Sequence, residues 1–120
     1  MRGFEDLHPL TARVDIYVPA TDGVNTAADT AAHVDGVAAT LSAWFGGATI
    51  APGAGCWVSD AVGLVKEATT VVYAYCTPEQ LEARAADLRQ MCADLAADLH
   101  QECIGVSLCG KMYFVPPVAA

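Results

Sequence analysis

The segment from Leu64 to Cys76 constrains the fold most, because its thirteen residues are rich in the β-branched and aromatic types that favour a strand. Side chains of a strand point alternately to its two faces. One face would carry Ala68, Val72 and Ala74, and the other would carry Val71, Tyr73 and Tyr75. Both sets are largely apolar, whereas a sheet with one wet face alternates apolar with polar residues. The strand therefore needs cover on both sides.

Two helices and several further strands are predicted around this strand. The predicted elements are, in chain order, a strand over 12–18, a helix over 26–45, a glycine-broken strand over 48–58, the long strand over 64–76, a helix from 77 to about 100, and strands over 104–108 and 111–115. This βαββαβ order with a C-terminal strand predicts a ferredoxin-like α+β fold, in which both helices pack on one face of an antiparallel sheet.

Local signals refine these boundaries. Thr77 and Gln80 have the spacing of a capping box, which predicts a sharp helix start. Pro52, Gly53 and Gly55 predict a bend or bulge in the segment 48–58. The 120 residues suit a single domain over 1–120, with 1–10 and 116–120 as peripheral arms.

Composition excludes several classes of protein. Hydrophobic residues make up 54% of the chain, which argues against disorder, yet no run is long enough for a membrane-spanning helix. The formal charge is −8, from 14 acidic and 6 basic residues, so the clustered cations of a nucleic-acid interface are missing. The start of the sequence lacks the pattern of a signal peptide, and the five cysteines form no C-x-x-C pair. We therefore expect a cytoplasmic protein that binds neither nucleic acid nor membrane.

The face of the long strand turned away from the helices is the candidate interaction surface. Small residues pack best beneath helices, so Val71, Tyr73 and Tyr75 are expected on the opposite face, with Tyr17 as a neighbour. Exposed apolar surface of this kind usually marks a binding site. We expect self-association into a homodimer or higher homo-oligomer. A small-molecule pocket on this face and a different protein partner are the alternatives.

Two glutamates are candidate general bases. Glu67 lies in the long strand on the same side as the tyrosines, and Glu102 follows the second helix. A structural role, as a hydrogen-bonding or ion-pair partner, is the competing interpretation for each. Trp57, beside the predicted bend, is expected either to anchor packing or to stack on a ligand.

The remaining motifs do not indicate a metal site, a cofactor site or a cysteine nucleophile. His100, Cys103 and Cys109 lack the short cysteine pair and the fourth ligand of a structural zinc site, so no metal is expected. The glycines match neither the phosphate-binding loop nor the dinucleotide fingerprint, so no cofactor is expected. Nothing in the sequence pairs one of the cysteines with an activating base. Asp87, Asp94 and Asp98 predict a solvated outer side of the second helix.

A few positions carry a resemblance to a known family. The Gly55-x-Trp57 step, Glu67 within a strand, and the sequence Gln101-Glu102-Cys103-Ile104 resemble a small bacterial domain-of-unknown-function family with a G-x-W step and a Q-E-S-V-like step. In this chain Cys-Ile replaces Ser-Val. The resemblance implies a compact, dimeric α+β protein and supplies no activity. Small proteins of this shape also occur in phages and mobile elements, and the resemblance is compatible with a ligand-sequestering role.

Taken together, these patterns favour a non-catalytic, dimeric binding or assembly protein over an enzyme. The residues expected near its ligand are Tyr17, Trp57, Glu67, Tyr73 and Tyr75. The alternative is a cofactor-free small-molecule enzyme of the isomerase or lyase type, with Glu67 or Glu102 as general base.

Overall fold

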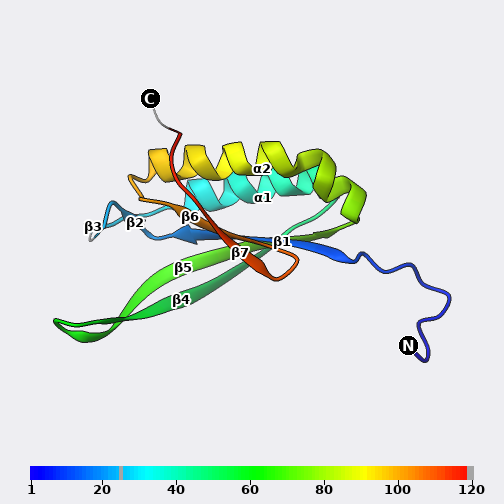
Figure 1. Ribbon diagram of the computed structural model, residues 1–120, viewed down its shortest axis with the longest axis horizontal. Helices are drawn as coiled ribbons and strands as arrows, with labels where there is room; N and C mark the ends of the chain where they lie inside the picture. Colours follow the sequence, from blue (N-terminus) through cyan, green and yellow to red (C-terminus); the bar gives the residue numbers. More distant parts are fainter. Residues whose placement is uncertain (25, 119–120) are drawn as a thin grey trace.

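The computed structural model describes residues 1–24 and 26–118, which form two helices and seven strands (Figure 1). The helices are α1 (Ala31–Phe45) and α2 (Pro78–Asp98). The strands are β1 (Ala12–Pro19), β2 (Thr21–Asp22), β3 (Thr26–Ala27), β4 (Thr49–Ser59), β5 (Gly63–Cys76), β6 (Ile104–Leu108) and β7 (Lys111–Val115). No helix within this part of the chain is long and apolar enough to cross a membrane.

Five of the strands form one sheet in the order β4-β5-β1-β6-β7, and each neighbouring pair is antiparallel. Both helices lie on the same side of this sheet (Figure 1). The structure thus confirms an α+β fold with two helices and an antiparallel sheet. The long β4–β5 hairpin extends beyond the helices, so its outer part has sheet partners and no helical cover (Figure 1).

The ends of the helices follow local chemistry. Thr77 accepts a hydrogen bond from the backbone N–H of Gln80, and the Gln80 side chain accepts one from the backbone N–H of Thr77. This reciprocal pair is the predicted capping box, and it fixes the start of α2. At the other helix, Gly46 adopts a φ of 92° and ends α1.

Two sequence-based expectations were wrong. The first helix begins at Ala31 and not at Thr26, because Thr26–Ala27 pairs with Thr21–Asp22 as a short hairpin. The Thr30 hydroxyl donates to the carbonyl of Pro19 at 2.9 Å, and this contact joins the residue before α1 to the end of β1. Of the bend or bulge expected over 48–58, the bulge is missing, because every residue from Thr49 to Ser59 pairs with one residue of β5.

The core lies between the helices and one face of the sheet. Val14, Ile16 and Val18 of β1 pair with Ala74, Val72 and Thr70 of β5, and this face is buried. The expected division of the long strand is confirmed, since Val72 and Ala74 are buried while Tyr73 and Tyr75 lie on the opposite face. Ala68 shares the helical face but is exposed, because β5 has passed the helices there.

Candidate functional site

The sheet face opposite the helices brings together residues from all five strands of the main sheet. Tyr17 of β1 pairs with Val71, Gly55 of β4 pairs with Glu67, and Gly105 of β6 pairs with Phe114 of β7. Opposed residues in an antiparallel pair share a face. The register therefore places these side chains on one surface, which we call the open face.

A hollow of about 450 Å³ lies on the open face where β5, β1, β6 and β7 meet the loop after α2. Its volume falls in the range of small-molecule sites, roughly 300–1,000 Å³. Glu67 and Tyr17 are both half-buried in its lining, and Phe114 and Met112 form its apolar rim. The lining residues outside these four are Pro19, Gly55, Cys56, Ala68, Thr69, Gln101, Cys103, Ile104 and Gly105. We call this the Glu67 hollow.

Glu67 is the acidic residue of the hollow. Three ion pairs join residues within the described ranges, and Glu67 takes part in none of them. A half-buried carboxylate without a cationic partner attracts a cation into an apolar site more strongly than a fully hydrated one does. The hollow can therefore hold a small molecule that carries a positive charge beside an apolar body.

Gly105 sets the shape of the hollow. A Cβ atom at this position would lie 2.5 Å from the Cε atom of Met112 and 3.6 Å from the Cδ2 atom of Tyr17. The Met112 side chain thus lies across the backbone of Gly105 and beside the Tyr17 ring. A larger residue at 105 would push the thioether of Met112 away from this seat.

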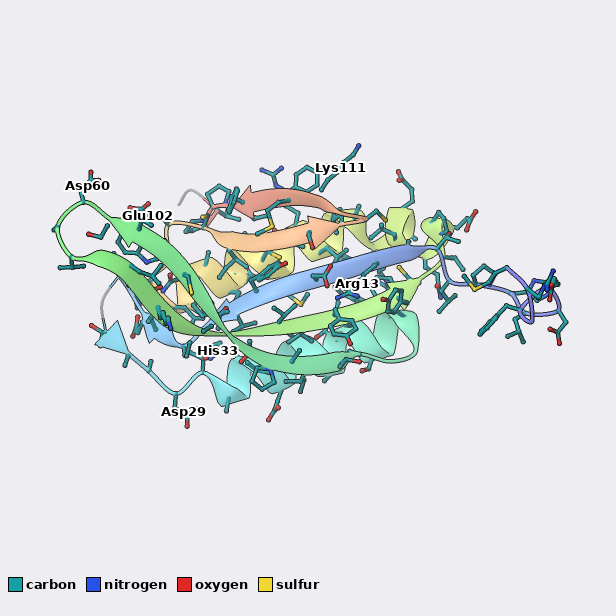
Figure 2. The ribbon with its side chains drawn as sticks, turned by 90° about the horizontal axis from the view of Figure 1, so that it is seen from below. Arg13, Asp29, His33, Asp60, Glu102 and Lys111 are labelled. Atoms are coloured by element: carbon teal, nitrogen blue, oxygen red, sulfur yellow. The ribbon has the colours of Figure 1, made fainter. Side chains whose placement is uncertain are left out.

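Arg13 lies at the other end of the open face (Figure 2), where it is the centre of a polar network. The guanidinium donates to the Asp15 carboxylate at 2.7 Å and to the Tyr75 hydroxyl at 2.8 Å. Its Cζ atom lies 4.0 Å from the centre of the Tyr73 ring. The Ser107 hydroxyl donates to the second oxygen of Asp15 at 2.8 Å. The pKa of Arg13 is raised, chiefly by its hydrogen bond to Asp15.

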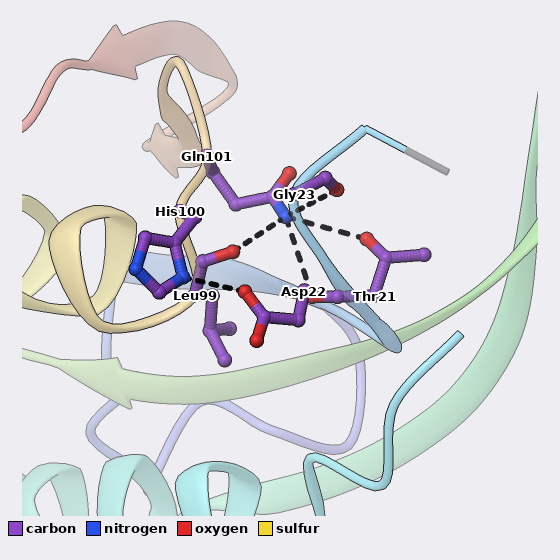
Figure 3. A network of polar contacts seen from close by, with 6 residues as sticks. All are labelled: Thr21, Asp22, Gly23, Leu99, His100 and Gln101. Carbon is purple, nitrogen blue, oxygen red and sulfur yellow. Dashed lines mark hydrogen bonds and ion pairs between the residues drawn. The ribbon is translucent and has the colours of Figure 1, made fainter. Parts of the chain in front are cut away.

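A second polar network lies beside the Glu67 hollow (Figure 3). The Nε2 atom of Gln101 lies within hydrogen-bonding distance of three carbonyl oxygens, those of Thr21, Gly23 and Leu99. His100 Nδ1 lies 2.6 Å from a carboxylate oxygen of Asp22. These contacts fasten the β2–β3 hairpin to the loop between α2 and β6. Gln101, which also lines the hollow, is thereby held in place.

The residues singled out in the sequence are distributed over three locations. Tyr17 and Glu67 share the hollow. Tyr73 and Tyr75 lie on the same face but belong to the Arg13 network. Trp57 is about half exposed on the outer β4–β5 hairpin and does not line the hollow.

Glu102 is exposed in the loop that precedes β6 (Figure 2), and its neighbour Gln101 lines the hollow in its stead. Met112, Phe114 and Gly105 were not singled out from the sequence. The expected pairing of β6 with β7 was the one signal that pointed to the edge where they lie.

Two of the five cysteines, Cys76 and Cys92, are buried in the core. Burial raises the pKa of Cys92 to about 11 and also raises the pKa of Cys76, so neither thiol ionises readily. All five cysteines are free thiols. Within residues 1–24 and 26–118, no group of three or more His, Cys, Asp or Glu side chains is placed to hold a metal ion.

Comparison with known proteins relates the fold to two solved structures. No protein-family model matches the chain, and no curated protein matches it. A phage SAM lyase in complex with S-methyl-5'-thioadenosine resembles it with a TM-score of 0.64 and 18% identity, over 93% of this chain and 94% of that chain. A phage SAM lyase in the apo state resembles it with a TM-score of 0.59 and 17% identity, over 91% of each chain.

Proposed function

We propose that this protein is a cofactor-free lyase that cleaves S-adenosylmethionine (SAM) and releases S-methyl-5'-thioadenosine at the Glu67 hollow. The observation that carries the proposal is Glu67 itself, a half-buried carboxylate without an ion-pair partner in an apolar hollow. The fold likeness to two phage SAM lyase structures supports the choice of substrate. It also favours the enzyme interpretation of the sequence over the non-catalytic one.

The chemistry of the hollow suits this substrate. SAM carries a sulfonium cation between an adenosyl group and an amino acid. A carboxylate such as Glu67 attracts that cation, and the Tyr17 ring provides a second attraction through its π-face. Phe114 and Met112 offer apolar surface for the thioether and the adenine. A neutral thioether is the product that leaves, so the attraction weakens once the bond has broken.

The cleavage step balances within the substrate. The bond between sulfur and the four-carbon amino acid chain breaks, and its electron pair stays on sulfur. The carbon atom that loses its bond to sulfur then forms a new bond in one of two ways. In an elimination, Glu67 takes a proton from the neighbouring carbon, and 2-aminobut-3-enoate forms. In an internal displacement, the substrate's own carboxylate closes a lactone, and Glu67 acts by holding the sulfonium.

Incubation of the purified protein with SAM, followed by chromatography and mass spectrometry, tests the proposal. We expect S-methyl-5'-thioadenosine together with one of the two four-carbon products, whose identity assigns the role of Glu67. Glu67→Gln should lower the rate by about a hundredfold or more. The matched control is Glu82→Gln on the exposed side of α2, which should keep full activity. Glu102→Gln tests the second candidate base. Loss of activity in this variant, with full activity in Glu67→Gln, would make Glu102 and not Glu67 the general base. No thioadenosine above background would overturn the proposal.

We also propose that the protein self-associates through the open face. Phe114 is 66% exposed, and Met112 and Tyr75 are about half exposed on the same face. A second copy laid against them would remove this apolar surface from water. Sedimentation velocity at micromolar concentration should show a dimer or a larger homo-oligomer, whereas a monomer would contradict this proposal.

Three further features are proposed with this function. The strand order β4-β5-β1-β6-β7 supports the ferredoxin-like topology, in which β7 adds to the edge of the sheet. The free thiols suit a reducing, cytoplasmic compartment. Since both structural neighbours are phage proteins, they support an origin in a phage or another mobile element.

A further inference from the structure

Residues 1–10 form an arm that lies away from the rest of the protein. The arm leaves the start of β1 and extends beyond the sheet and both helices (Figure 1). Its large apolar side chains recur every three residues: Phe4 is 58% exposed, Leu7 is 56% exposed and Leu10 is 50% exposed. Apolar side chains that their own chain leaves uncovered mark a segment that binds to another surface.

Two consecutive turns give the arm its local shape. The backbone N–H of Phe4 donates to the carbonyl of Met1, and that of Leu7 donates to the carbonyl of Phe4, each at 3.1 Å. A turn of this kind brings its first and last residues within about 7 Å, so Phe4 and Leu7 lie close together. Between them are Glu5 and Asp6, which take part in no ion pair in the described part of the chain. This turn therefore presents two apolar side chains and two carboxylates.

An apolar slot lies at the β7 edge of the sheet, between β7 and α2. Three buried core residues, Leu88, Val106 and Val115, line it. Its volume of about 250 Å³ is below the roughly 300–1,000 Å³ of small-molecule sites, so it suits one or two apolar side chains. The slot is distinct from the Glu67 hollow, because Phe114 is the one residue that lines both.

Two cations border the slot. Arg89 of α2 lines it, and Lys111 is on the same face of β7 as Tyr113, which also lines it. Both cations are exposed, and neither takes part in an ion pair within residues 1–24 and 26–118. On a chain with 6 basic and 14 acidic residues, they make a local cationic spot. The slot is thus complementary to an apolar segment that carries carboxylates.

The path of the arm directs it away from the slot of its own chain. Leu10 lines a hollow together with Phe45 at the end of α1 and Tyr73 of β5. In the sheet, β5 and the pair β6–β7 lie on opposite sides of β1, so the arm leaves β1 on the side remote from the slot. Pro9 favours an extended conformation of His8, which carries the arm outward. A second copy is therefore the occupant that the geometry favours.

We propose that the Phe4–Leu7 turn of one copy binds in the slot between α2 and β7 of a second copy. Phe4 enters the slot, and the two carboxylates of the turn pair with Arg89 and Lys111. This contact goes beyond the proposed cleavage of SAM and is separate from the association through the open face. It makes the arm a link between copies.

Photochemical cross-linking in an isotope-labelled mixture tests the proposal. Leu7→p-benzoylphenylalanine places the photoreactive group beside an intact Phe4. This full-length variant is mixed at micromolar concentration with the parent protein labelled uniformly with nitrogen-15, irradiated, digested and analysed by mass spectrometry. We expect links from position 7 to labelled peptides that contain residues 85–89 or 113–116. The control is Val62→p-benzoylphenylalanine on the exposed turn between β4 and β5, which should give few links to these peptides.

The apolar contact is tested by adding Phe4→Ser to the photoreactive copy. The yield of these links should fall about tenfold, because the side chain that enters the slot is removed. Adding His8→Ser instead is the matched control, since His8 is exposed on the arm outside the Phe4–Leu7 turn, and the yield should stay the same. Both changes are in the exposed arm and leave the core intact.

The ionic contact is tested by reversing charge on each side. Arg89→Glu with Lys111→Glu in the labelled copy should lower the yield several-fold, and Glu5→Lys with Asp6→Lys in the photoreactive copy should restore it. Arg84→Glu is the control on α2 outside the slot and should have no effect.

The location of the links decides the outcome, and no step of the test uses SAM, so it is independent of the proposed activity. Links confined to the unlabelled copy would show that the arm folds back on its own chain. Links to labelled peptides of the open face, or no more links than the Val62 control gives, would also overturn the proposal.

Discussion

Both ends of the open face are built on strands of the main sheet, but they differ in whether their charged side chains have partners within the fold. At one end, Arg13 and Asp15 neutralise each other, and Ser107 and Tyr75 complete their hydrogen bonds. At the other end, Glu67 has an apolar hollow around it and no ion pair within the described residues. A charge whose partners belong to the fold stabilises the fold, whereas a charge without them is free to meet a ligand. The contrast supports a structural role for the first end and the proposed chemistry for the second.

Removing the carboxylate at the satisfied end should have the largest effect on stability. Asp15→Ala leaves Arg13 and Ser107 without their shared partner on a half-buried surface. We expect the free energy of unfolding to fall by about 2–3 kcal/mol, measured by urea denaturation. The exposed Asp35 of α1 provides the control, and Asp35→Ala should change stability by less than about 0.5 kcal/mol. Equal effects at the two sites would remove the distinction between the two ends.

Reshaping the hollow should affect ligand affinity more than stability. In Gly105→Ala the new methyl group displaces the flexible end of Met112 into the hollow. The affinity for S-methyl-5'-thioadenosine, measured by calorimetry, should fall about threefold to tenfold.

The double variant Gly105→Ala with Met112→Ala should bind S-methyl-5'-thioadenosine as well as Met112→Ala alone does, because the side chain that the new methyl group would displace is gone. Gly53→Ala on β4 is the control, since a Cβ there has no contact closer than 3.9 Å and lies outside the hollow. A double variant that bound more weakly than Met112→Ala alone would show that Gly105 does not act through Met112.

The smallest expected effect is at the rim of the Arg13 network. Tyr75→Phe removes one exposed hydrogen bond but keeps the ring beside the guanidinium. Stability should change by less than about 0.5 kcal/mol, as for other exposed charged contacts. A thermal melt that showed a loss above about 1 kcal/mol would mean that the hydroxyl, and not the Asp15 pair, holds the network together.

Local patterns in the sequence predicted much of the fold. The alternation in β5 predicted which side chains face the helices, and Thr77 with Gln80 predicted the start of α2, because both signals act over a few residues. The β2–β3 hairpin was missed because two-residue strands carry no period. Its position depends instead on contacts with Gln101, some 80 residues away.

The candidate site was only partly predictable for the same reason. Glu67 and Tyr17 could be assigned to one face from strand parity alone. The contact of Asp15 with Ser107 depends on the register of β6 against β1, which the sequence does not state. The seat of Met112 over Gly105 depends on a further register, that of β7 against β6.

The most direct test of the account compares Glu67→Gln with Asp15→Asn, measuring turnover of SAM and urea stability in each. We predict that Glu67→Gln lowers the rate of release of S-methyl-5'-thioadenosine by about a hundredfold or more, while the unfolding midpoint stays within error of the parent. Asp15→Asn should lower the midpoint and keep the turnover of the folded fraction. Glu67→Gln with full turnover, or Asp15→Asn with parental stability and lost turnover, would contradict the assignment of chemistry to the Glu67 end.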